Sequence, residues 1–200
     1  MIRKLSEKIL TVLIRNQGVK ETQRDIVLFG IEQGIVTALE ITLLLITSAI
    51  LGSVVKGVII LMAFTTIRIY AGGYHAKTQI GCVIRTWIFF VMVILCQNHF
   101  DINIYIQEVV VIWNFLILVW ICPLENEKRK FVGNQRKTYR KKAIRNQIIW
   151  IVILNICVFT NHGIISQCIT WGVLMANVLL ITGKLEELLE KQRSSEHAGI

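Results

Sequence analysis

Two side chains that can perform chemistry together, His75 and Cys82, lie seven residues apart in the sequence. A thiolate is a strong nucleophile, and an imidazole within hydrogen-bond reach can take the thiol proton. The imidazolium that results can later protonate a leaving amine, as cysteine peptidases require. On a continuous α-helix the two residues would share a face but lie about 10 Å apart along the axis. The chemistry therefore needs a break in the helix between them.

The sequence contains such a break at the adjacent glycines Gly72 and Gly73, because glycine is a poor helix former. A turn here would carry His75 back towards Cys82 if the next helix begins near Thr78, a residue type favoured at helix N-caps. The break lies between two apolar segments. At membrane depth, irregular backbone survives only where it is buried in protein or faces a wet cavity, so the break predicts a functional site.

Basic residues surround the predicted site. Arg68, Lys77 and Arg85 would lower the pKa of the nucleophilic cysteine. They also have a structural interpretation, in which Lys77 anchors at lipid headgroups and the two arginines extend towards the membrane surface. The candidates for substrate binding are Arg68, Gly72, Gly73 and Lys77.

The other four cysteines have a simpler interpretation. They lie in or at the ends of apolar runs, where a free thiol acts as a small hydrophobe. None forms a Cys/His cluster with the spacing of a zinc site, and HExxH and GxSxG are absent from the sequence. We therefore expect no metal and no cofactor. These cysteines are Cys96, Cys122, Cys157 and Cys168.

Two acidic residues, Glu40 and Glu108, lie within apolar stretches. A charge there is costly and usually faces the protein interior. Either glutamate could orient His75 as a third member of the site, or pair structurally with Arg68 or Arg85. We favour the structural pairing.

The elements that must position these residues are membrane helices. Hydrophobic residues make up 54% of the chain and charged residues 18%, and the charges are confined to a few places. We predict an all-α polytopic membrane protein with about six transmembrane helices, within a range of four to six. The apolar stretches are 35–51, 54–69, 80–97, 102–122, 147–160 and 163–183.

Three regions follow from this pattern. Residues 1–34 are predicted to be amphipathic and to lie at the membrane interface, because apolar residues recur there at helical spacing. Residues 35–183 would form the transmembrane catalytic domain, and residues 184–200 a cytoplasmic C-terminal tail. The apolar positions of the first helix are Leu5, Ile9, Val12 and Leu13.

The formal net charge of +9 is concentrated in segment 123–146, which has nine basic residues and two glutamates. A basic tract can bind nucleic acid, but this one joins two apolar segments, so we expect a cytoplasmic loop and no nucleic-acid partner. Six spans then place both chain ends and segment 70–79 on the cytoplasmic side of a bacterial cell membrane.

The run from Arg68 through Gly72, Gly73 and His75 to Cys82 closely resembles the signature of the AgrB (accessory gene regulator B) family of membrane endopeptidases in bacterial quorum sensing. The similarity covers nearly the whole chain. It includes the amphipathic N-terminus, Glu40 in the first span, and Cys122-Pro123-Leu124 before the basic segment.

This resemblance implies a catalytic pair at His75 and Cys82. It also implies cleavage of a membrane-associated AgrD-type precursor, a thioester on Cys82, and release of a cyclic thiolactone or lactone peptide. It further suggests a homodimer. Two other functions remain open, a small transporter and a non-enzymatic membrane adaptor that recruits a partner through the basic segment.

Overall fold

The computed structural model of the chain describes residues 2–15, 24–72, 79–124 and 134–198. Within these ranges the ordered elements are all helices, which confirms the predicted all-α class. The helices are α1 (Ile2–Arg15), α2 (Arg24–Ile50), α3 (Val54–Ala71), α4 (Gln79–His99), α5 (Ile104–Ile121), α6 (Gln135–Phe159) and α7 (Gly163–Ala198).

Five of the described helices are long and apolar enough to cross a membrane. They are α2 from Gly30 onwards, α3, α5, α6 and α7 as far as Leu189. A shorter apolar stretch, Val83–His99, lies within α4. The chain is therefore a multi-pass membrane protein, and this number lies within the predicted range.

Several helices are longer than the apolar stretches that predicted them. α2 runs without interruption from Arg24 to Ile50, so residues 24–34 of the predicted interfacial region and the first span form one helix. Within α2, no side chain would obstruct an added Cβ at Gly30 or Gly34, and neither glycine breaks the helix. α7 likewise continues from the last span to Ala198, through most of the predicted tail.

α6 differs from expectation in the same way. It begins at Gln135, so the second half of the predicted basic loop is helical. Arg, Lys, Gln and Ala are all good helix formers, which explains why the basic residues there continue the helix. The predicted stretch 147–160 would reach only about 21 Å, whereas the 25 residues of α6 extend about 37 Å, enough to span a bilayer.

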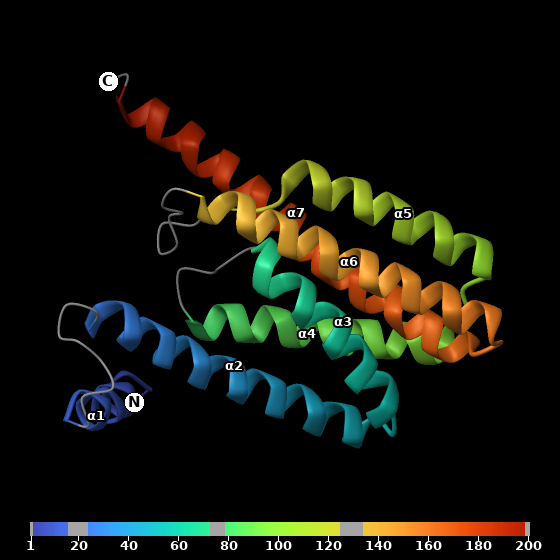
Figure 1. Cartoon of the computed structure of the whole chain (residues 1–200), viewed down its shortest axis with the longest axis horizontal. Helices are drawn as coiled ribbons and strands as arrows, with labels where there is room; N and C mark the ends of the chain where they lie inside the picture. The colour runs from blue at the N-terminus through green and yellow to red at the C-terminus, as the bar shows by residue number, and fades with distance from the viewer. Residues whose placement is uncertain (1, 16–23, 73–78, 125–133, 199–200) are drawn as a thin grey trace. The chain divides into compact units, whose positions relative to one another are not determined.

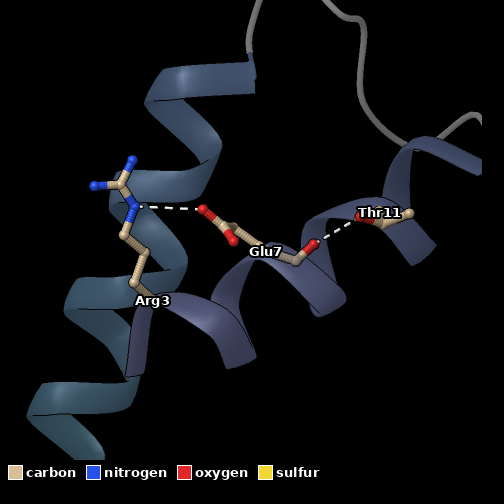
Figure 2. Close-up of polar contacts among 3 residues, drawn as sticks. All are labelled: Arg3, Glu7 and Thr11. Atoms are coloured by element: carbon tan, nitrogen blue, oxygen red, sulfur yellow. Dashed lines mark hydrogen bonds and ion pairs between the residues drawn. The ribbon is translucent and has the colours of Figure 1, made fainter. Parts of the chain in front are cut away.

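The chain divides into two compact units, residues 1–46 and 47–200. In the first unit, α1 buries Ser6 and Leu10, and an ion pair stabilises its exposed side. Figure 2 shows the Arg3 guanidinium donating to the Glu7 carboxylate at 3.3 Å, and the Thr11 hydroxyl donating to the Glu7 carbonyl. The apolar positions predicted from the sequence are all exposed, namely Leu5, Ile9, Val12 and Leu13.

In the second unit, α7 packs against α3, α4, α5 and α6, and Figure 1 shows it running alongside α5 and α6. Gly172 of α7 allows this helix to lie close to α3, because a Cβ added at Gly172 would lie 2.7 Å from the carbonyl oxygen of Ile60. The core of this unit consists mainly of fully buried aliphatic side chains. The largest include Ile60, Ile67, Phe90, Ile94, Leu118, Leu154, Ile169, Met175 and Leu180.

Polar contacts fasten one end of this unit. The Lys56 ammonium donates to the Asn98 side-chain oxygen at 2.7 Å, and the Asn98 amide donates to the Ser53 hydroxyl at 3.0 Å. The Gln167 side chain donates to the carbonyl of Phe100. These bonds join the start of α3 to the end of α4, and the start of α7 to the residue after α4.

Candidate functional site

The end of α3 and the start of α4 lie at the other end of the unit. α3 ends at Ala71, and Gly72 follows with φ +79°, where its amide donates to the Arg68 carbonyl at 3.1 Å. α4 begins at Gln79. The predicted helix break is therefore confirmed, and we call this end of the second unit the break end. The remaining predicted residues of the run, Gly73, His75, Lys77 and Thr78, lie outside the described residues.

The segment after α5 packs against the end of α3. The Leu124 amide donates to the Ala71 carbonyl at 3.1 Å, and Cys122, Pro123 and Leu124 are all buried. A Cβ at Gly72 would lie 2.9 Å from the Leu124 carbonyl oxygen. Glycine is thus required at Gly72 both for its positive φ and for the close approach of this backbone.

Arg68 lies in the last turn of α3 and is held between two side chains. Its guanidinium carbon is 5.2 Å from the centre of the Phe64 ring, a cation–π contact. Its Nη1 donates to the Thr86 hydroxyl of α4 at 3.4 Å. Thr86 is 1% exposed. Arg68 is therefore directed to the interface between α3 and α4, and this differs from an arginine that extends to the membrane surface.

The position of Cys82 follows from the backbone of α4. It is the fourth residue of this helix, and Thr86 comes four residues later. Residues four apart share one side of an α-helix, about 6 Å apart along its axis. The backbone of Cys82 therefore lies one helical turn before Thr86, the residue that contacts Arg68. The Cys82 side chain, like His75, lies outside what the structure describes, so the catalytic pair stays a prediction.

The start of α6 covers the same end. The Tyr139 ring lies 6.0 Å from the Tyr70 ring, and the Lys142 ammonium lies 5.3 Å from that ring. Arg140 donates to the Val119 carbonyl of α5 at 2.9 Å. α6 thus fastens α3 and α5 together where the break occurs, and brings basic residues to its edge.

One turn deeper, α6 and α3 share a polar layer. The Asn146 amide donates to the Thr66 carbonyl and the Trp150 indole to the Thr66 hydroxyl, each at 2.8 Å. Gln147 beside them is fully buried, and neither of its polar atoms finds a partner in the described part of the chain. These bonds fix the register of α6 against α3.

Two of the remaining cysteines, Cys122 and Cys168, are buried. Burial raises the pKa of Cys122, which follows α5, to about 12, and the positive charge of Arg140 lowers it only in part. Cys168 is fully buried, whereas Cys96 and Cys157 are half-buried. The predicted role as buried hydrophobes is confirmed for Cys122 and Cys168. In the described ranges, no three His, Cys, Asp or Glu side chains gather as a metal site.

The two membrane glutamates have separate positions. Glu108 is the fifth residue of α5, so about 20 Å of helix separate it from the break end. This distance excludes Glu108 as a partner of Arg68 and as the orienting residue of a site at the break. Glu40 is half-buried on α2 in the first unit and stays a predicted candidate.

Sequence reasoning alone did not find Thr86 or the backbone contact of Leu124. The spacing of four residues between Cys82 and Thr86 on one helix was available as a signal for Thr86. No comparable signal marks the pairing of Leu124 with Ala71, because it joins segments about fifty residues apart.

The fold and the break end together define a class of protein. The chain is a multi-pass α-helical membrane protein in which a glycine ends one helix before the next begins, and an arginine of the first helix contacts the second. The family model described as accessory gene regulator B matches residues 6–181. The chain therefore belongs to the AgrB family, which confirms the resemblance read from its sequence.

Individual relatives are distant. The chain is 24% identical over 123 residues to "Accessory gene regulator protein B" of Staphylococcus intermedius, covering 62% of this chain and 63% of that protein. It is 24% identical over 140 residues to "Putative AgrB-like protein 1" of Clostridium perfringens, covering 68% and 72%. It is 25% identical over 142 residues to "Putative AgrB-like protein" of Clostridium acetobutylicum, covering 70% and 66%. The chain thus spans slightly less than two thirds of the first and third relatives. No solved structure matches it.

Proposed function

We propose that this chain is a membrane-embedded cysteine endopeptidase that matures a quorum-sensing peptide, with Cys82 as the nucleophile and His75 as the general base. The observation that carries the proposal is the break between Ala71 and Gln79, which places Cys82 at the start of a new helix. A single helix continued through both residues would hold them about 10 Å apart along its axis, and α3 ends at Ala71, before either of them. Membership in the AgrB family supports the same assignment.

The first half of the reaction is cleavage. His75 takes the proton of the Cys82 thiol, and the thiolate attacks the scissile carbonyl carbon of the precursor. The C–N bond breaks as the imidazolium protonates the leaving nitrogen, so the C-terminal fragment departs as an amine. The N-terminal fragment stays on Cys82 as a thioester.

The second half is cyclisation. A thiol inside the bound fragment, or a hydroxyl in some precursors, loses its proton to His75 and attacks the thioester carbon. The Cys82 sulfur leaves and takes that proton back, and a thiolactone or lactone ring is released. Exchange of one thioester for another keeps the bond type, so this step is nearly balanced in energy. The attacking group is part of the bound fragment, so its proximity to the thioester accelerates cyclisation. A site that excludes water protects the thioester from hydrolysis.

The substrate in this proposal is an AgrD-type precursor with an acidic C-terminal part. The first three turns of α6 have six basic residues, and the whole helix contains no Asp or Glu. A helix N-terminus also attracts negative charge, so the start of α6 suits an acidic segment. Neutralisation of Lys128–Lys130, or of the exposed Arg136, Lys137 and Lys141, should slow cleavage and reduce its salt dependence. Unchanged rates and salt dependence would remove the electrostatic attraction from the proposal.

The same charges support a cytoplasmic location for the break end, since positive residues concentrate in cytoplasmic loops. Both chain termini then lie on that side. The homodimer and the interfacial role of residues 1–34 remain part of the proposal.

The decisive experiment is reconstitution with a candidate precursor, followed by mass spectrometry of the peptide and the protein. Wild type should give the cleaved fragment, the cyclic product and a peptide adduct on Cys82. Cys82→Ala should give none of these. Cys82→Ser cannot form a thioester and should give little or no cleavage, and any adduct on it would be an oxygen ester. Cys157→Ala, which changes a half-buried cysteine on α6, is the matched control and should behave as wild type. Full activity of Cys82→Ala would instead favour a transporter or an adaptor.

A further inference from the structure

Thr86 is a buried polar side chain on α4, next to Arg85. It is 1% exposed, and its hydroxyl oxygen accepts a hydrogen bond from Arg68 of α3 at 3.4 Å. The arginine is held from its other side by the Phe64 ring, 5.2 Å from the guanidinium carbon. A threonine hydroxyl and an aromatic face on two helices therefore fix one cation inside the membrane-spanning unit.

The backbone of the proposed nucleophile lies one helical turn from the residue that holds this cation. Because Cys82 precedes Thr86 by four residues in α4, both occupy the same side of this helix, one turn apart. A positive charge held at the Thr86 hydroxyl is thus about one helical turn, roughly 6 Å, from the level of Cys82. Over such a distance in a poorly hydrated interior, a cation stabilises a thiolate.

We propose that Thr86 is a positioning residue that holds the Arg68 guanidinium where it stabilises the Cys82 thiolate. This inference rests on the proposed function, in which Cys82 is the nucleophile. It adds a residue that acts through another, and it names Arg68 as the cation concerned. Thr86 itself touches neither the peptide nor the reacting atoms.

Other charged or titratable groups at this end set the background against which Arg68 acts. None of them is substituted in the variants below. Among the described residues of the second unit they are Tyr70 on α3, Arg85 on α4, Cys122 after α5, Arg136, Lys137, Tyr139, Arg140, Lys141, Lys142 and Arg145 on α6, and Lys184, Glu186 and Glu187 on α7.

The test is the pH dependence of Cys82 alkylation by iodoacetamide in the full chain, in detergent or liposomes, with Cys82 quantified by peptide mapping. Thr86→Val keeps the shape of the side chain and removes the hydroxyl. It should move the midpoint of the curve to higher pH and slow alkylation about threefold below the midpoint, with the high-pH plateau unchanged. Thr86→Ser restores the hydroxyl and should restore the wild-type curve.

Two further variants complete the design. Thr170→Val makes the same change at a residue that is also 1% exposed, whose hydroxyl donates to the Ser166 carbonyl, and it should leave the curve unchanged. Arg68→Gln should shift the midpoint at least as far as Thr86→Val. The double variant of Arg68→Gln and Thr86→Val should shift it no further than Arg68→Gln alone, since both remove one interaction.

Four results would overturn the inference: a wild-type curve for Thr86→Val, a fall of the plateau together with the low-pH limb, failure of Thr86→Ser to restore the curve, or additive shifts in the double variant. Alkylation does not require catalysis, so it separates this inference from the proposed function. If Cys82→Ala still cleaves the precursor, the proposed function fails whatever the alkylation curves show. If the curves fail and Cys82→Ala is inactive, only the role of Thr86 is lost.

Discussion

The Leu124 backbone amide donates a hydrogen bond to the carbonyl of Ala71 at 3.1 Å and joins the segment after α5 to the last residue of α3. The last carbonyls of any helix lack partners within the helix, so this bond satisfies one of them where α3 ends. It also brings the Leu124 backbone over Gly72, within reach of any Cβ placed there. The end of the helix before Cys82 is therefore defined by a segment from elsewhere in the chain.

Substitution of Gly72 should disturb the break. In Gly72→Ala the new Cβ meets the Leu124 carbonyl at 2.9 Å and φ is +79°, so we expect a loss of about 1–3 kcal/mol in the free energy of unfolding. Precursor cleavage should fall as well. Unfolding in mixed detergent micelles and the cleavage assay measure the two effects.

The control is Gly52→Ala, at another glycine with positive φ, +62°, where nothing lies within 4 Å of an added Cβ. It should show the cost of backbone strain alone and leave cleavage unchanged. Equal losses of stability and activity in both variants would mean that the Leu124 contact has no special effect.

The close approach of α7 to α3 predicts a second sensitive glycine. In Gly172→Ala the added methyl group would lie 2.7 Å from the Ile60 carbonyl oxygen and 2.8 Å from the Ala63 Cβ, both in the fixed core of α3. We expect a loss of about 1–3 kcal/mol from overpacking, measured as the free energy of unfolding. Gly34→Ala, at a helical glycine with open space around it, should be neutral or stabilising because alanine favours helix. A stabilised Gly172→Ala would contradict this packing.

The bond between Trp150 and Thr66 should contribute measurably to the fixed register of α3 and α6. Removal of the Thr66 hydroxyl in Thr66→Val leaves the Trp150 indole N–H without its acceptor, at a cost of about 1–3 kcal/mol in unfolding free energy. Trp150→Phe removes the donor. In a double-mutant cycle the two losses should be less than additive, with a coupling energy of about 0.5–1.5 kcal/mol. Strict additivity would show that the two groups act independently.

The raised pKa of Cys122 predicts an unusual alkylation profile. An ordinary cysteine reaches half its full rate near pH 9 and comes close to a plateau about one pH unit higher, whereas burial raises the pKa of Cys122 to about 12. The alkylation rate of Cys122 should therefore still rise about tenfold per pH unit between about pH 10 and pH 11, without a plateau. Because the folded-state pKa lies above the unfolded value, the buried thiol favours the folded state below about pH 9, and this contribution is lost as the pH rises towards 12. A midpoint near pH 9 in folded protein would show that Cys122 is not desolvated.

Much of the architecture was predictable from the order of apolar and charged residues. Long apolar stretches need lipid or protein around them, so the spans, the all-α class and the break at Gly72 follow from composition and spacing alone. Helix limits were harder to predict. α6 begins well inside the predicted basic loop, because its lysines and arginines favour helix. These residues are too polar to be recognised from the sequence as part of a membrane span.

The sequence by itself determined which residue types are present for chemistry, and the run from Arg68 to Cys82 indicated the family. Only the tertiary structure decided that Arg68 is bonded to Thr86 and that Leu124 closes the end of α3. It also removed Glu108 from the site, because α5 places that residue far from the break end. The physical reason is that helical spacing is local and repeats every few residues, whereas contacts between helices depend on packing among segments distant in the chain.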